Sequence, residues 1–151
     1  MTLSATIVLA CLFSVIALST CVGTVLDRDD GNGTMVVVIA GPTSAKPHCI
    51  SLDGVINGVD ALKATGSNIT IDQQQLGPVV CKIGEYGCPE NDCFCSCAGT
   101  PCVYWEYFHL INGKWESSKQ GAGDYRVSAG TVDGWLWNVA GASLPPGPFI
   151  C

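Results

Sequence analysis

Short apolar runs separated by glycine-rich and polar turns follow one another from residue 34 onward, a pattern typical of β-strands. The run 35–41, MVVVIAG, is β-branched and ends at a glycine, which predicts a buried strand. The segments 68–72 and 78–84 predict two further strands. Near the C-terminus, 133–139 predicts the last strand, in which Trp135 and Trp137 share a face because side chains alternate along a strand.

The segment 103–117 predicts a β-hairpin. Asn112-Gly113 stands between two aromatic runs, and this dipeptide favours the tight turn that joins antiparallel strands. Alternation divides the first strand into two faces. One face carries Trp105, Tyr107, His109 and Ile111, and the other carries Tyr104, Phe108 and Leu110.

One short helix is expected before residue 66. Asn57 is an N-cap residue with Asp60 three positions later, and Gly66 is placed to end the helix. Its predicted apolar face consists of Val55, Val59 and Leu62. Together these patterns predict an α+β domain of five or six strands and one packed helix, with a cysteine-rich, disulfide-bonded loop between two strands.

The first 26 residues carry no charge, and the stretch 5–26 is long enough to cross a bilayer. Three interpretations stay open: a signal peptide cleaved near Cys21-Val22-Gly23, lipidation at Cys21, or a retained membrane anchor. All three export the rest of the chain, so the protein is expected to be secreted or tethered to the outer face of the cell membrane. Membrane contact is then confined to residues 1–26, and the polar segment 27–33 is a linker.

Export determines how the cysteines are interpreted. Beyond Cys11 and Cys21, eight remain, and cysteines pair in an oxidising compartment. Cys97 and Cys102 are expected to pair across the tight return at Gly99 and Pro101. Cys49 is expected to pair with Cys151, and the other four among themselves: Cys81, Cys88, Cys93 and Cys95.

A metal site is the alternative use of these cysteines. The spacing in 81–102 matches neither a zinc ribbon nor a ferredoxin. The ligands of such a site would be Cys88, Cys93, Cys95 and His109.

Charge and motifs exclude two classes of function. The seven Lys and Arg residues form no basic patch and the net charge is −6, so nucleic acid is not an expected partner. The chain contains no G-x-S-x-G, no H-E-x-x-H and no complete phosphate loop, which argues against an enzyme.

Four segments occur in an order that resembles the transcobalamin-like C-terminal domain family, the small domain that ends transcobalamin and intrinsic factor. These are Ala61-Leu62-Lys63 at the helix end, the aromatic strand from Trp105 to Gly113, Gly121-Ala122, and the strand from Gly130 to Trp137. The resemblance covers residues 34–139. It implies a β-grasp-like sheet packed on one helix over 34–140. The cysteine-rich insert 81–102 lies outside the pattern of the vitamin carriers, and a Pro/Gly-rich tail, 141–151, follows the domain.

The aromatic residues predict a pocket for a flat ligand, because rings supply rigid contact area with a polar edge. The candidate ligand-binding residues are Trp105, Tyr107, Trp135 and Trp137. The resemblance implies that the ligand is cobalamin or a related corrinoid, held outside the membrane for an uptake transporter. The alternative is an extracellular structural domain whose aromatic face docks another protein without any small molecule.

Overall fold

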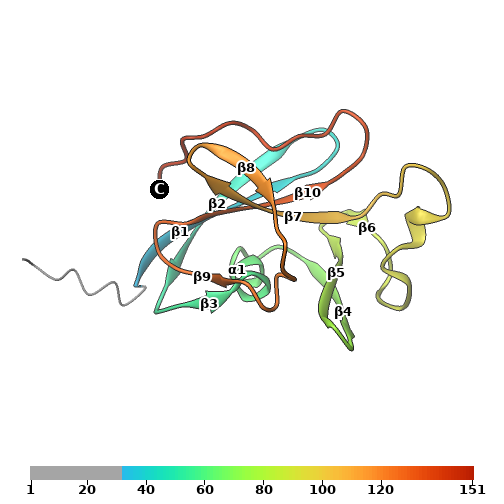
Figure 1. Ribbon diagram of the computed structural model, residues 1–151, viewed down its shortest axis with the longest axis horizontal. Coiled ribbons are helices and arrows are strands. Elements are labelled where there is room, and N and C mark those ends of the chain that lie inside the picture. Colours follow the sequence, from blue (N-terminus) through green and yellow to red (C-terminus); the bar gives the residue numbers. More distant parts are fainter. Residues whose placement is uncertain (1–31) are drawn as a thin grey trace, which may run out of the picture.

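The computed structural model describes residues 32–151, so the predictions for residues 1–26 and for most of the linker lie outside the described residues. Its centre is a five-stranded sheet in the order β2-β1-β10-β7-β8 (Figure 1). The first and last long strands, β1 and β10, are parallel neighbours, and the other pairs are antiparallel. These strands are β1 (Gly33–Ala40), β2 (Ala45–Leu52), β7 (Trp105–Ile111), β8 (Lys114–Ser117) and β10 (Val132–Trp137).

Two smaller sheets and one helix lie on one side of this sheet. The helix α1 (Gly58–Ala64) is flanked by a two-stranded ladder of β3 (Ile56–Asn57) with β9 (Arg126–Val127). The third sheet consists of β4 (Ile69–Gln74), β5 (Gly77–Ile83) and β6 (Tyr86–Gly87). The cysteine-rich loop follows β6 and contains two short 3-10 turns, η1 (Glu90–Asp92) and η2 (Cys95–Cys97).

The helix begins and ends where the sequence predicts. The Asn57 side chain accepts the backbone N–H of Asp60 at 2.8 Å, and Gly66 adopts a left-handed φ of +73° after the last turn. Val59 and Leu62 are buried as predicted. Val55 is not part of this face, because it lies before β3 and outside the helix, and its side chain is 54% exposed.

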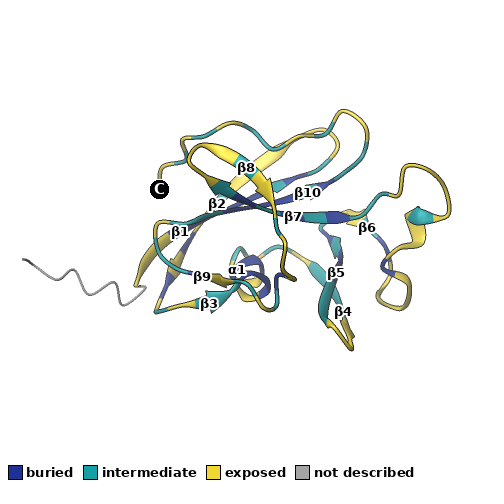
Figure 2. Ribbon diagram, viewed as in Figure 1, coloured by how far each residue is buried: buried dark blue, intermediate teal, exposed yellow. Residues whose placement is uncertain are grey.

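The hydrophobic core lies between the helix and one face of the central sheet. Residues on β1, β7 and β10 alternate into it and meet the buried residues of α1 (Figure 2). The Tyr107 and Trp135 rings stack at 4.7 Å, and the Trp105 and Trp137 rings lie 5.6 Å apart. A Cβ at Gly58 would collide with the Tyr107 hydroxyl, so the helix start packs directly on the strand.

The C-terminal segment covers the opposite face of the sheet and returns to β2 (Figure 1). The Trp115 indole N–H donates to the Pro145 carbonyl at 2.7 Å, and a Cβ at Gly134 would lie 2.7 Å from Leu144. The chain ends in a disulfide between Cys151 and Cys49 on β2. Residues 141–151 therefore pack as a second, smaller layer on the sheet.

In the described part of the chain, the architecture is mostly β with one small helix, three sheets and four disulfides. The predicted strands, hairpin and helix are present, and the cysteine-rich stretch is a loop between two strands. The expected number of strands, five or six, is too low, because residues 32–151 contain ten. Among residues 32–151, no helix is long and apolar enough to span a membrane.

Candidate small-molecule pocket

Four disulfides join the eight cysteines of the described chain. They are Cys49–Cys151, Cys81–Cys93, Cys88–Cys95 and Cys97–Cys102. The expected pairings are thus confirmed. This number of disulfides indicates an oxidising, extracytoplasmic environment, because such bonds are rare where thiols are kept reduced.

The alternative metal site is not assembled. The sulfurs of Cys88, Cys93 and Cys95 are in disulfides, so they cannot act as thiolate ligands. His109 is buried on the core face of the sheet, where its Nδ1 contacts Asp133 and its Nε2 contacts Ser118. Among the described residues, no cluster of three or more His, Cys, Asp or Glu side chains is arranged to hold a metal.

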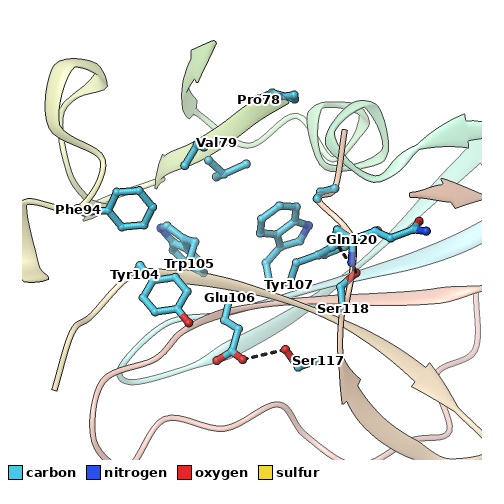
Figure 3. A pocket seen from close by; sticks show the side chains of 14 residues that line it. Pro78, Val79, Phe94, Tyr104, Trp105, Glu106, Tyr107, Ser117, Ser118 and Gln120 are labelled. Atoms are coloured by element: carbon cyan, nitrogen blue, oxygen red, sulfur yellow. Dashed lines mark hydrogen bonds between the residues drawn. The ribbon is translucent and has the colours of Figure 1, made fainter. Parts of the chain in front are cut away.

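A pocket of about 290 Å³ opens between the β4-β5 sheet, the cysteine-rich loop and β7 (Figure 3). Pro78 and Val79 on β5 face Trp105 and Tyr107 across it. The segment that follows β8 closes one end with Ser118 and Gln120. The complete lining is Pro78, Val79, Val80, Phe94, Tyr104, Trp105, Glu106, Tyr107, Ser117, Ser118, Gln120, Gly121, Ala122 and Trp135.

Three of the four predicted ligand-binding residues line this pocket, namely Trp105, Tyr107 and Trp135. All four belong to the hydrophobic core, so the three that line the pocket present little of their surface to it. Trp137 contacts the Trp105 ring and is not part of the lining. The predicted aromatic face is therefore mainly core, and it supplies the floor of the pocket.

The cysteine-rich loop supplies an aromatic lip that the sequence analysis did not identify. Phe94 is 46% exposed, and its ring meets the Tyr104 ring edge-on at 6.2 Å. The neighbouring Cys93 and Cys95 are bonded to Cys81 and Cys88, so the backbone on both sides of Phe94 is tied to the β5-β6 region. The sequence gives one local signal for this contact: Phe94 stands between two cysteines of the cysteine-rich loop.

A chain of hydrogen bonds runs beside the pocket, behind its floor. The Tyr107 hydroxyl donates to one carboxylate oxygen of Asp133, and His109 Nδ1 lies 2.9 Å from the other. His109 Nε2 lies 2.9 Å from the Ser118 hydroxyl. Asp133 is only 2% exposed, so these partners replace the water that its carboxylate would otherwise bind.

Ser118, His109 and Asp133 follow one another as in the triad of serine hydrolases, but the serine hydroxyl is used differently. It donates to the Gln120 carbonyl at 2.8 Å and accepts the Gln120 N–H at 3.3 Å. The Gln120 carbonyl thus competes for the hydroxyl hydrogen that His109 would have to accept as a general base. The His109 ring is also covered by the Tyr125 ring, stacked at 3.7 Å. These hydrogen bonds hold the segment 118–120 in place at the end of the pocket.

The environment of Tyr107 leads to a prediction for alkaline pH. Burial, followed by the negative charge of Asp133, raises the pKa of the Tyr107 phenol above its ordinary value of 10.0. The folded protein keeps this proton at a pH where the unfolded chain loses it, so the stability that Tyr107 contributes is present below pH 10 and falls above it.

We expect the free energy of unfolding of the wild type to fall above pH 10 more steeply than that of Tyr107→Phe, by up to about 1.4 kcal/mol per pH unit. Urea denaturation of both proteins between pH 8 and about pH 11 measures the difference. Parallel curves for the two proteins would show that the phenol is not held in its neutral form.

One buried donor in the pocket wall has no partner. Trp135 is 3% exposed, and its indole Nε1 has no acceptor among the described residues. Two other tryptophans differ: Trp105 donates to the Tyr86 carbonyl at 3.0 Å, and Trp115 donates to the Pro145 carbonyl at 2.7 Å. A buried N–H without an acceptor is rare, since it costs about 1–3 kcal/mol.

A scan against protein-family models finds no matching family, and a search of curated proteins finds no matching relative.

Proposed function

We propose that this protein is an exported binding module that holds a small molecule in the pocket between β5, β7 and the cysteine-rich loop. The observation that carries the proposal is a pocket with an aromatic floor at the junction of three separate elements. Its volume of about 290 Å³ lies just below the usual range for small-molecule sites, which begins at about 300 Å³, so it suits a small ligand or one group of a larger ligand.

The disulfides support this function because they hold the pocket open in one shape. Cys81 lies on β5, one residue beyond the lining residue Val80, and its partner Cys93 precedes the lip residue Phe94. Two walls of the pocket are thereby joined covalently. A site that is ordered before the ligand arrives loses less conformational entropy on binding.

The resemblance to the transcobalamin-like C-terminal domain leads to a more specific form of the proposal, in which the ligand is a corrinoid being delivered to an uptake transporter. A corrinoid is larger than this pocket, so only a peripheral group would enter it and the rest would lie over Phe94 and Tyr104. We propose binding without catalysis, because the Ser118 hydroxyl donates to a backbone carbonyl.

Substitution of Val79 tests whether the pocket binds ligands. Val79→Arg would fill the pocket with a long charged side chain, and Val55→Arg is the matched control on an exposed valine outside the lining. Equilibrium dialysis against cyanocobalamin and a panel of uncharged aromatic compounds measures binding. We expect at least one compound to bind wild type and Val55→Arg equally, and Val79→Arg at least about tenfold more weakly.

Two results would contradict the proposal. If Val79→Arg and Val55→Arg bind the same compounds equally well, the ligand lies elsewhere. If no compound binds the wild type, the alternative of an extracellular domain that docks another protein is favoured. Circular dichroism of both variants confirms that the fold is retained before affinities are compared.

A further inference from the structure

A second pocket lies at the β2 edge of the central sheet, between the β1–β2 turn, the α1–β4 loop and the β5–β6 turn. We call it the β2 pocket; its volume is about 310 Å³, and its lining includes Ile39, Lys46, His48, Asn68, Ile83 and Tyr86. We infer that the β2 pocket binds a small organic carboxylate beside Lys46 and His48. This inference goes beyond the proposed function, because the β2 pocket and the pocket of Figure 3 share only Trp105 in their linings.

The register of β2 directs the two basic side chains to this pocket. Lys46 and His48 lie opposite Ile39 and Val37 of β1, and side chains directly opposite each other in a ladder lie on the same face. Val37 belongs to the core and Ile39 packs against it, so Lys46 and His48 lie on the face that carries the core. The same face of β2 continues with the buried Ile50. It therefore changes from apolar to basic at the pocket.

Both basic groups are accessible, and the protein does not neutralise them. Lys46 is exposed and His48 is partly exposed. Within residues 32–151 neither side chain has a hydrogen bond or an ion pair, and Glu85, the one acid of the lining, makes no ion pair with Lys46. Burial, followed by the positive charge of Lys46, lowers the pKa of His48 from its ordinary value of 6.5. A bound carboxylate would offset the repulsion between the two groups.

The charges of the lining suit a monoanion. Lys46 is the one Lys or Arg in the lining. A phosphate dianion would bring a second negative charge without a partner, near Glu85 and in a protein of net charge −6. The exposed Asn68 amide makes no hydrogen bond within the described residues, so it adds a neutral donor to the pocket.

The rest of the wall is largely apolar and is held in shape. Ile83 is buried, and the Tyr86 side chain is 38% exposed. The Tyr86 ring packs on the backbone of Gly41, where a Cβ would lie 3.0 Å from the ring. The Gly84 N–H donates to the Asn68 carbonyl at 2.8 Å. These contacts join the segments around the pocket, so the apolar part of a ligand meets a surface that is already formed.

Phenylacetate and phenylacetamide test the inference, because they have nearly the same shape and only phenylacetate is charged. A titration followed by NMR measures binding through the Cε1–H signals of the two histidines of the chain, and His48→Gln assigns the signal of His48. We expect phenylacetate to bind about five- to tenfold more tightly than phenylacetamide and to shift the His48 signal. The signal of His109, which is not in the lining, should stay unchanged.

Lys46→Met removes the charge and keeps an unbranched side chain. We expect this variant to lose the preference for phenylacetate over phenylacetamide. Lys114→Met is the matched control, because Lys114 is exposed on β8 at the opposite edge of the sheet, and it should bind phenylacetate as the wild type does. Bound phenylacetate should also raise the pKa of His48, since a carboxylate stabilises the charged imidazole.

Four outcomes overturn the inference. Equal binding of acid and amide by the wild type would show that charge takes no part, and tighter binding of phenyl phosphate than of phenylacetate would show that the pocket selects a dianion. An undiminished preference for phenylacetate in Lys46→Met would place the carboxylate elsewhere. If no probe shifts the His48 signal, the β2 pocket is not a carboxylate site, whatever the uncharged compounds do.

Val79→Arg separates this inference from the proposed function. A loss of phenylacetate binding in Val79→Arg would assign that ligand to the pocket of Figure 3 and contradict the β2 site. Phenylacetate binding that Val79→Arg retains, together with no binding of the uncharged compounds by the wild type, would support the β2 site and contradict the proposed function alone.

Discussion

Replacing Cys49 and Cys151 together by serine is expected to lower the free energy of unfolding by about 4–5 kcal/mol. Their disulfide joins residues 102 positions apart, nearly the whole described chain, and it fastens the C-terminal segment to β2. Of the four disulfides it closes the longest loop, so its removal gives the unfolded chain the largest gain in conformational entropy. Guanidinium denaturation under non-reducing conditions measures the loss.

The matched control is the double serine variant of Cys97 and Cys102. These residues are five positions apart, so the same relation between loop length and entropy predicts a loss of about 2 kcal/mol. Equal losses in the two variants would contradict this explanation and would mean that local packing decides the effect of each disulfide. A Cys49/Cys151 variant as stable as the wild type would show that the C-terminal segment stays in place without its covalent attachment.

Asp133→Ala is expected to destabilise the protein by about 3–5 kcal/mol. The substitution removes the shared acceptor of Tyr107 and His109 and leaves both polar groups buried without it. It also leaves a small cavity in the core at the position of the Asp133 carboxylate. Thermal and urea unfolding, monitored by tryptophan fluorescence, give the change in free energy.

Asp133→Asn separates the loss of hydrogen bonds from the loss of charge. The amide oxygen can accept from Tyr107, and the amide N–H₂ can donate to His109 Nδ1 once the histidine carries its proton on Nε2. We therefore expect Asp133→Asn to cost less than half as much as Asp133→Ala. Equal effects of the two substitutions would show that the negative charge of Asp133, rather than the number of its hydrogen bonds, stabilises this part of the core.

Local patterns predict the central elements well because those elements depend on local chemistry. Asn112-Gly113 forms the β7-β8 turn with φ angles of 50° and 76°, the left-handed values that this dipeptide tolerates. The helix cap at Asn57 likewise depends on residues three positions apart. Both were predicted from residue type alone.

The strands that were missed lack such a pattern. β2 contains Lys46, Pro47 and His48, which are unusual in a central strand. It forms because it lies at the edge of the sheet, where β1 supplies all its partners and one side faces solvent. The two-residue strands β3, β6 and β9 depend on contacts with segments far away in the sequence, so no local signal predicts them.

The aromatic residues of the candidate site were identified, but their role was only partly predictable. Alternation correctly groups Trp105 with Tyr107 and Trp135 with Trp137, and the two pairs lie side by side on one face of the central sheet. It cannot tell whether such a face is core or surface. The pocket exists because Cys81–Cys93 brings the loop that carries Phe94 to β5, a contact between distant residues. The unpartnered indole of Trp135 is likewise a property of the packed structure.

The native mass of the protein, purified after export into an oxidising compartment and mixed with the uncharged aromatic panel, tests the central claim most directly. We expect one bound molecule per chain in the wild type and none in Val79→Arg. The denatured, unreduced mass should be about eight daltons below the all-thiol value for residues 32–151, because each of the four disulfides removes two hydrogen atoms. A native mass without any adduct, or an adduct that persists in Val79→Arg, would contradict the assignment of this pocket as a ligand site.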